Sequence, residues 1–149
     1  MSKRRIIDNV LVAFETMHHI SQKKNGKLGE MALKLETSKT YDRVEWGCLE
    51  KIMLKMGFNT LWVDLMMRCV RSVTYAVKIN GKPQGVIIPT RGLCQGDPLS
   101  PYLFLSCAEG LSALIRKSME RGAIKGIATY TRGPSISHLF FANNRLIFC

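Results

Sequence analysis

Three short segments of the chain carry polar residues of the kinds that bind cations, phosphates or nucleotides. They are residues 32–46 (ALKLETSKTYDRVEW), 91–104 (RGLCQGDPLSPYLF) and 137–149 (SHLFFANNRLIFC). Glu36 in the first segment ends an apolar stretch, and a carboxylate is a ligand that Mg²⁺ prefers. In the second segment Arg91 could contact a phosphate, and the glycines allow a close approach of the backbone. By themselves, residues 92–98 also fit an ordinary connection from loop to helix, and Asn143-Asn144 fits a turn.

The cysteines and histidines do not have the spacing of a metal site. They are Cys48, Cys69, Cys94, Cys107, Cys149, His18, His19 and His138. No CxxC pair and no Cys/His cluster occurs among them. We therefore expect the cysteines to be small buried or half-buried side chains in a reducing compartment. The histidines are expected to have structural or surface roles.

The chain is strongly basic. It contains 22 Lys and Arg against 11 Asp and Glu, which gives a formal net charge of +11 over 149 residues. This excess favours a polyanionic partner, most commonly nucleic acid, although a basic protein that binds no polyanion has the same composition. Arg4, Arg5, Lys23, Lys24 and Lys27 are candidates for contacts with a triphosphate or a template. The alternative for these five residues is a solvated basic surface.

Targeting signals are not evident in the sequence. No apolar run approaches the roughly 20 residues of a membrane-spanning helix. The first residues, MSKRRIIDNV, are basic, but no apolar core with a small-residue cleavage site follows them. We therefore expect an intracellular protein, nuclear or cytoplasmic, that is not secreted and has no membrane partner.

Apolar spacing in the first half of the chain predicts three helices and one strand. Apolar residues recur every three or four positions over residues 7–18, about 44–56 and about 60–71, as in amphipathic helices. Gly57 stands where a left-handed C-terminal cap belongs. Residues 31–35 alternate well enough to form a short strand that leads into Glu36.

A hairpin is predicted next. Residues 73–79 alternate between apolar and polar positions, and Asn80-Gly81 follows directly. A type I′ turn requires positive φ at both central positions, and Asn-Gly supplies it. The return strand is expected at about residues 84–88.

One long helix and two strands are predicted for the remainder. Asp97-Pro98 and Ser100-Pro101 each resemble a helix start, and Gly122 ends the helix. Two apolar strands, about 136–142 and 145–149, are expected to meet at Asn143-Asn144. No linker or internal repeat divides the chain, so we predict a single α+β domain with helices packed on one face of a small antiparallel sheet.

The three segments resemble, in this order, polymerase motifs of LINE-type (non-LTR) reverse transcriptases, especially those of plant elements. RGLCQGDPLSPYLF is the most specific of them. The resemblance extends to IIDNVLVAFETMHHI near the start and to the stretch from LEKIMLKMGF to VKINGKPQG, so that it covers nearly the whole chain.

The resemblance implies the fingers and palm of a right-hand polymerase fold. Residues 1–30 and about 72–92 would be fingers-like, and about 31–71 and 93–149 would be palm. The chain is thereby expected to be a partial reverse transcriptase domain of residues 1–149 without the thumb.

The resemblance also implies a reaction and its metal site. The family joins nucleotides by in-line phosphoryl transfer, for which two Mg²⁺ ions stabilise the attacking and leaving oxygens. One Asp of the first motif and an Asp-Asp pair of the third hold these ions. In this sequence the three positions are Glu36, Asn143 and Asn144. We therefore expect the binding of Mg²⁺ to be weak or lost and the enzyme to be inactive.

Other positions match the family's substrate-binding residues. Tyr41 corresponds to an aromatic steric gate against a ribose 2′-hydroxyl, and a core tyrosine is the alternative interpretation. Gln95 and Gly96 match residues of the nucleotide and template pocket, and Arg91 and Arg5 are candidate phosphate contacts.

Two further residues of these segments have ambiguous roles. Asp42, by motif register, is not the catalytic carboxylate, and we favour a cap of the following helix. Cys94 stands where the plant elements usually have Arg, so one phosphate or template contact is expected to be missing.

Three hypotheses for function follow. The first is an impaired RNA-directed DNA polymerase fragment, with an RNA template, an RNA–DNA hybrid and deoxynucleoside triphosphates as its partners. The second is a nucleic-acid-binding module without catalysis, and the third is a retroelement remnant without function. The oligomeric state is left open by the sequence.

Overall fold

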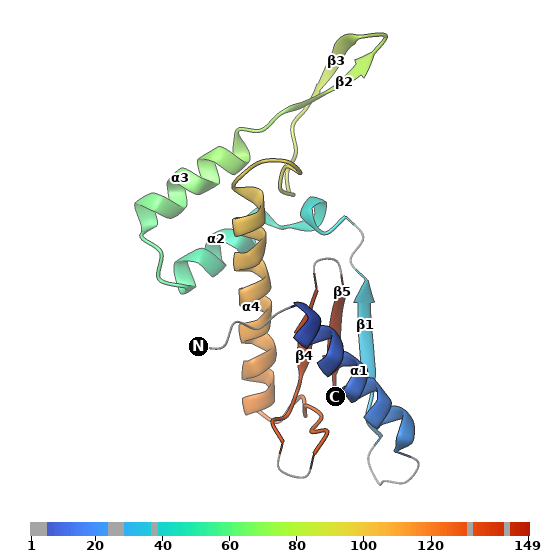
Figure 1. Cartoon of the computed structure of the whole chain (residues 1–149). Coiled ribbons are helices and arrows are strands. Elements are labelled where there is room, and N and C mark those ends of the chain that lie inside the picture. Colours follow the sequence, from blue (N-terminus) through green and yellow to red (C-terminus); the bar gives the residue numbers. More distant parts are fainter. Residues whose placement is uncertain (1–5, 24–28, 37–38, 131–132, 142–143) are drawn as a thin grey trace. The chain divides into compact units, whose positions relative to one another are not determined.

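The computed structural model describes residues 6–23, 29–36, 39–130, 133–141 and 144–149 (Figure 1). The chain divides into two compact units, of which one combines Met1–Ser38 with Leu111–Cys149 and the other is Lys39–Gly110. The architecture is α+β, with helices packed against small antiparallel sheets, as predicted.

The first unit is built on a three-stranded antiparallel sheet. Its strands are β1 (Ala32–Glu36), β4 (His138–Phe140) and β5 (Asn144–Phe148), in the order β1-β5-β4. The sheet therefore joins the first and third motif segments, because β5 lies in the middle and pairs with both neighbours (Figure 1).

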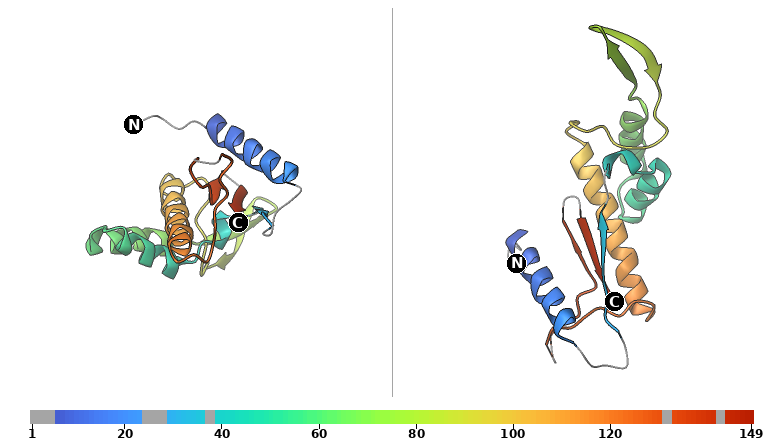
Figure 2. Two further views of the ribbon diagram at one scale, coloured as in Figure 1. Left: turned by 90° about the horizontal axis from the view of Figure 1, so that it is seen from below. Right: turned by 90° about the vertical axis from the view of Figure 1, so that its right-hand side faces the viewer.

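Helices cover both faces of this sheet, so the prediction that they pack on one face was wrong. Leu139 packs in one cluster with Ala13 of α1 (Ile6–Gln22). The residue before it on the strand, His138, shares a hydrogen bond of 2.7 Å with the hydroxyl of Ser112 on α4 (Ser100–Glu120). Because successive strand residues point to opposite faces, α1 and the last part of α4 lie on opposite sides of the sheet (Figure 2).

A small apolar core lies between α1 and the sheet. Its buried members are Ala13, Ile127, Leu139 and Phe148. Phe148 is fully buried, whereas much of α1 outside this core is exposed, including Phe14 at 72%. Burying a large aromatic ring is worth several kcal/mol, so Phe148 is the main anchor of this unit.

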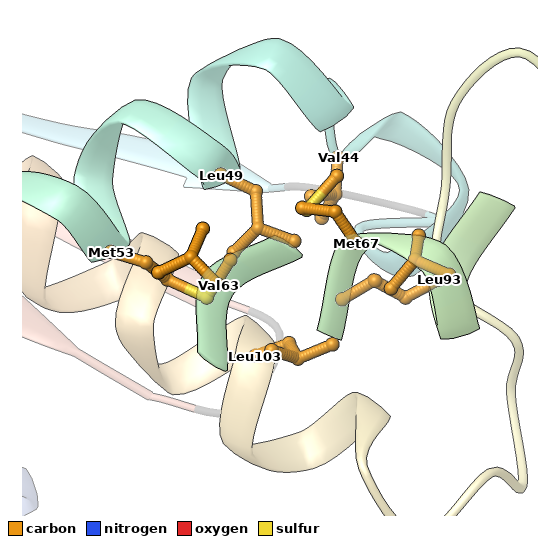
Figure 3. Close-up of a cluster of buried hydrophobic side chains, with 8 residues drawn as sticks. Val44, Leu49, Met53, Val63, Met67, Leu93 and Leu103 are labelled. Carbon is orange, nitrogen blue, oxygen red and sulfur yellow. The ribbon is translucent and has the colours of Figure 1, made fainter. Parts of the chain in front are cut away.

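The second unit packs helices around a separate core. Its elements are α2 (Trp46–Lys55), α3 (Thr60–Arg71), the hairpin of β2 (Tyr75–Ile79) and β3 (Lys82–Ile87), and the start of α4. The buried side chains of this core are Val44, Leu49, Met53, Val63, Met67, Val70, Leu93 and Leu103, and Figure 3 labels all of them except Val70. Asn59 caps α3 by accepting a hydrogen bond from the Leu61 amide at 2.9 Å.

Several predicted elements are confirmed with small shifts of their ends. The hairpin turn has positive φ at Asn80 (49°) and Gly81 (83°), as a type I′ turn requires. Gly57 and Gly122 also adopt positive φ, at 86° and 73°, just after α2 and α4.

Two details differ from the predictions. Asn144 is the first residue of β5 rather than part of the turn, because its backbone pairs with β1. Asp42 does not cap α2. It lies in a short 3₁₀ helix, η1 (Tyr41–Arg43), and the residue at the N-cap of α2 is Glu45, which makes no side-chain capping bond.

Among the described helices, none combines the length and the apolar character needed to span a bilayer.

We predict that Phe148→Ala lowers the free energy of unfolding by about 3–5 kcal/mol, because it removes a fully buried ring. Phe14→Ala on α1 is the matched control, and its effect should stay within about 0.5 kcal/mol because the ring is mostly exposed. Urea unfolding followed by circular dichroism measures both variants. Equal losses in the two would contradict this description of the core.

Candidate functional site

The ends of β1 and β5 bring the first and third motif segments together. Glu36, the last residue of β1, is the antiparallel register partner of Asn144, the first residue of β5. Directly opposed residues of such strands have Cα atoms about 4.5–5.5 Å apart. The two predicted site positions are therefore neighbours on the backbone, while Asn143 lies outside the described residues.

Asn144 has a buried oxygen that lacks a partner. Its side-chain Oδ1 accepts no hydrogen bond from the described residues. Its backbone carbonyl accepts a hydrogen bond from the Phe141 amide at 2.8 Å. Leaving a buried acceptor unsatisfied costs about 1–3 kcal/mol, and an amide oxygen is also an acceptable ligand for a hard cation.

The residues at this strand end do not fit a pair of divalent cations. Glu36 supplies the one carboxylate of the three predicted positions, and an asparagine oxygen is neutral. Within the described part of the chain, no group of three or more His, Cys, Asp or Glu side chains could hold a metal ion. The donors present suit at most one weakly held cation.

In the second unit, the loop that begins the second motif is fixed to the end of the first motif. The Gly92 amide donates to the Val44 carbonyl and the Leu93 amide to the Tyr41 carbonyl, both at 2.8 Å. These bonds join two segments about 50 residues apart in the chain. We call this pairing, together with Trp46, the loop clamp.

Trp46 completes the loop clamp with its side chain. Its Nε1–H donates to the Gly92 carbonyl at 2.7 Å. Gly92 has a φ of 92°, and a Cβ there would lie 3.1 Å from the Cα of Asp42. Both the backbone conformation and the close approach therefore require glycine at this position.

Tyr41 lies at the same place, where its ring stacks on Phe104 with the centroids 4.9 Å apart. The ring is half-buried and packs against the core of the second unit. This packing holds the tyrosine in a defined position beside the loop clamp. It is compatible with both roles considered for Tyr41, the steric gate and the core residue.

The remaining loop residues face solvent. Arg91 is about 60% exposed, and its Nη1 lies 3.5 Å from Oε1 of Glu45. Gln95 and Gly96 are exposed as well, and Gly96 has a φ of 100°. A bound phosphate would have to compete with Glu45 for Arg91, and an exposed ion pair is weak enough to be exchanged.

Cys94 interacts with Tyr75 and does not supply the positive charge of the arginine that the plant elements usually have at this position. The pKa of Tyr75 is raised above its ordinary value. Desolvation of the tyrosine is the main cause, and a hydrogen bond with the side chain of Cys94 is the second. Both residues line a small pocket with Trp46, Asp97 and Ser100. No Lys or Arg side chain lines this pocket. The pocket therefore offers no positive charge that could bind a phosphate in place of the arginine that the plant elements usually have at this position.

Of the predicted basic residues near the start of the chain, the structure describes one. Lys23 forms an ion pair with Glu30, next to a contact of 3.6 Å between His19 and Glu30. Arg5, Lys24 and Lys27 lie outside the described residues, as does Arg4. The contribution of this segment to phosphate binding stays a prediction.

Sequence reasoning missed Trp46 and the pair of Ser112 and His138. The tryptophan sits in the first motif segment, but its bond to Gly92 connects distant parts of the chain and has no local signal. His138 is held between the hydroxyls of Ser112 (2.7 Å) and Ser137 (2.8 Å). This arrangement fastens α4 to β4, which is a structural role of the kind predicted for the histidines.

Comparison with known proteins adds a family and two relatives. The family model described as reverse transcriptase (RNA-dependent DNA polymerase) matches residues 2–149. An uncharacterized mitochondrial protein of Arabidopsis thaliana is 54% identical over 66 residues, which are 44% of this chain and 54% of that protein. An uncharacterized 149 kDa protein of transposon TX1 from Xenopus laevis is 29% identical over 116 residues, which are 78% of this chain and 9% of that protein. The chain thus spans about half of the first relative and a small part of the second.

For the loop clamp we predict that Trp46→Phe lowers the free energy of unfolding by about 1–3 kcal/mol. The substitution keeps an aromatic ring but leaves the Gly92 carbonyl without its donor. Trp62→Phe is the matched control, because Trp62 is 40% exposed and stacks on Phe58. Its effect should be smaller than about 0.5 kcal/mol. Chemical denaturation of both variants tests this, and indistinguishable midpoints would show that the bond to Gly92 does not stabilise the loop.

Proposed function

The chain belongs to the reverse transcriptase family, and from this premise we propose that it is a polymerase-domain segment of a plant-like LINE-type (non-LTR) retroelement that has lost its catalytic metal site. The family's reaction depends on divalent metal ions. When bound, the two ions stabilise the attacking and leaving oxygens of nucleotide transfer. In the proposal these ions are Mg²⁺.

The register of β1 and β5 carries this proposal. It places Glu36 opposite Asn144, where the resemblance requires two of the three metal-binding carboxylates. With Asn at positions 143 and 144, one formal negative charge stands in place of three, against the +4 of two divalent ions. Glu36 also extends about 1.5 Å further than the family's Asp.

The expected consequence for catalysis is large. Metal and electrostatic stabilisation each contribute several kcal/mol to such a reaction. Since about 1.4 kcal/mol corresponds to a factor of ten in rate, losing the metal pair removes many orders of magnitude. The Oδ1 of Asn144, which accepts no hydrogen bond from the described residues, is a neutral oxygen and supplies none of the charge that the ions require.

The residues that match the family's substrate-binding positions are better preserved in this sequence than those at the metal-binding positions. We propose that Tyr41, Arg91, Gln95 and Gly96 contact a deoxynucleoside triphosphate and the template strand, with Arg5 as a further phosphate contact. The loop clamp supports this assignment. Its hydrogen bonds hold the start of the loop and the backbone of Tyr41 as one piece, so that the exposed Gln95 and Gly96 extend from a fixed base.

A non-catalytic nucleic-acid-binding module is the second candidate function. The observation that favours it is the net charge of +11, which does not depend on the metal positions. An RNA template or an RNA–DNA hybrid would be the partner in this case. The third hypothesis, a retroelement remnant without function, would be favoured by a folded chain that binds neither Mg²⁺ nor nucleic acid.

A calorimetric titration with Mg²⁺ tests the loss of the metal site. The chain itself should show no saturable binding at submillimolar Mg²⁺. The triple variant Glu36→Asp, Asn143→Asp, Asn144→Asp should gain it, because it restores three carboxylates at one strand end. Each single replacement should do much less, since residues that act as a unit are strongly non-additive.

The control for this titration adds the same negative charge elsewhere. Asn80→Asp with Gln84→Glu places two carboxylates on the exposed hairpin and should not create a saturable site. If the triple variant bound Mg²⁺ no better than this control, the proposed metal site would be wrong. Primer extension with the triple variant would show in addition whether activity returns.

A separate prediction concerns Tyr41. Tyr41→Ala should abolish any preference for a deoxynucleoside over a ribonucleoside triphosphate, because the ring that would exclude the 2′-hydroxyl is gone. Tyr41→Phe keeps the ring and its stacking on Phe104 and should keep the preference. Competition binding with the two nucleotides measures it. A loss of stability in Tyr41→Ala with no change in preference would favour the core tyrosine.

A further inference from the structure

The last part of α4 and the turn after it carry a concentration of positive charge. Residues 111–149 include six Lys or Arg and a single acidic residue, Glu120. Four of the six lie close together in sequence and are exposed: Arg116, Lys117, Arg121 and Lys125. We call these four residues the α4-end patch. It is distinct from the strand end and from the loop clamp described above.

Helix geometry directs two of these cations away from the protein interior. Ile115 is buried, and each residue of a helix turns by about 100°. Lys117 and Arg121 therefore lie roughly 200° and 240° around the helix from Ile115, on its outer side. The Arg121 amide still donates to the Lys117 carbonyl at 3.2 Å, so that helical spacing extends to Arg121.

The chain then reverses direction, and Lys125 follows the reversal. Gly122, with a φ of 73°, donates to the Met119 carbonyl at 2.9 Å, and the Ala123 amide donates to Ser118 at 2.9 Å. Figure 1 shows this end of α4 in orange, leading into the segment before β4. The patch thus spans a helix end and its turn.

Four exposed cations elsewhere in the described chain are paired with carboxylates, whereas others, such as Lys51, Lys55 and Lys82, form no ion pair with a described residue. Arg68 pairs with Asp64, Arg71 with Glu50, Arg91 with Glu45 and Lys23 with Glu30. By contrast, no carboxylate of the described residues forms an ion pair with any member of the α4-end patch.

The fold alone does not account for this charge. Like charges four residues apart on a helix, such as Lys117 and Arg121, destabilise it. The partial negative charge at a helix C-terminus offsets this for cations of the last turn, but not for Lys125 beyond the helix. An external anion would neutralise all four.

We propose that the α4-end patch binds the sugar–phosphate backbone of nucleic acid, through residues that belong to neither the strand end nor the loop clamp. Guanidinium and ammonium groups donate charge-assisted hydrogen bonds to phosphate oxygens. An acidic protein is the less favoured partner, because protein interfaces are organised around several large apolar anchors. Between residues 111 and 125 the exposed large apolar residue is Leu114 alone.

Binding to the patch needs no metal, so it can be tested apart from the proposed loss of catalysis. The affinity of the complete chain for a fluorescently labelled RNA–DNA hybrid is measured by anisotropy in EDTA at several salt concentrations. Cations that neutralise phosphates release counterions, and the log–log slope against salt falls by about 0.9 per contact for a duplex. The substitutions Lys117→Gln and Arg121→Gln together should reduce the slope by roughly 1.8 and weaken binding on the order of 50-fold at 0.1 M salt.

Arg68→Gln with Arg71→Gln is the matched control, because it also removes two exposed positive charges from one helix. These arginines are ion-paired, so the slope should remain that of the unchanged chain. A further variant, Lys117→Arg with Arg121→Lys, keeps the charge and should bind as the unchanged chain does. Thermal unfolding of each variant shows whether a loss of binding reflects a loss of folding.

The inference is supported if the glutamine variant of the patch, folded like the control, loses affinity and slope while the control does not. It is overturned if both variants lose the same amount, since binding would then depend on net charge alone. Absence of binding by the unchanged chain at low salt would overturn it as well. A patch-dependent affinity for polyglutamate without affinity for the hybrid would assign the surface to an acidic protein instead.

Discussion

The antiparallel register between β1 and β5 is the constraint on which the rest of the first unit depends. Five consecutive pairs, from Ala32 with Phe148 to Glu36 with Asn144, determine which residues meet. At one end of this ladder Phe148 enters the apolar core. At the other end two polar positions from distant motifs are placed opposite each other. A shift of one residue would reverse the faces of all these side chains, so the same pairing that buries Phe148 also defines the strand end.

In the proposed function, the strand end combines an intact scaffold with altered chemistry. Backbone pairing does not depend on whether a side chain is an amide or a carboxylate, and so Asn144 retains its place in β5. Electrostatic binding of divalent ions does depend on it, because an amide lacks the charge that offsets two divalent cations. Fold and reaction therefore rest on different properties of the same residues. In the proposed function, a member of the reverse transcriptase family retains the strands and the loop clamp while its metal positions change.

Charge is distributed unevenly over the protein. Cations of α3 and of the loop before α4 are matched with carboxylates on neighbouring turns or segments. Those at the end of α4 have no such match among the described residues. The net charge of the chain does not distinguish paired from unpaired cations. Attraction of a polyanion depends on this distinction, because a cation that is already paired with a carboxylate contributes less to it. The proposed surface at the end of α4 differs from other unpaired cations of the described chain in that its four members lie within residues 116–125.

The sequence by itself determined the elements whose causes are local. Helical periodicity identified α1, α2 and α3, Asn80-Gly81 identified the hairpin, and Gly122 marked the end of α4, because each signal acts within a few residues. The motif order also indicated the family. Tertiary structure decided what depends on distant contacts: the placement of Asn144 in β5 opposite Glu36, the helices on both faces of the sheet, and the bond from Trp46 to Gly92. It also decided that Asp42 lies in a 3₁₀ turn instead of capping α2. These features follow from pairing and packing between segments far apart in the chain, and no local pattern of residues encodes them.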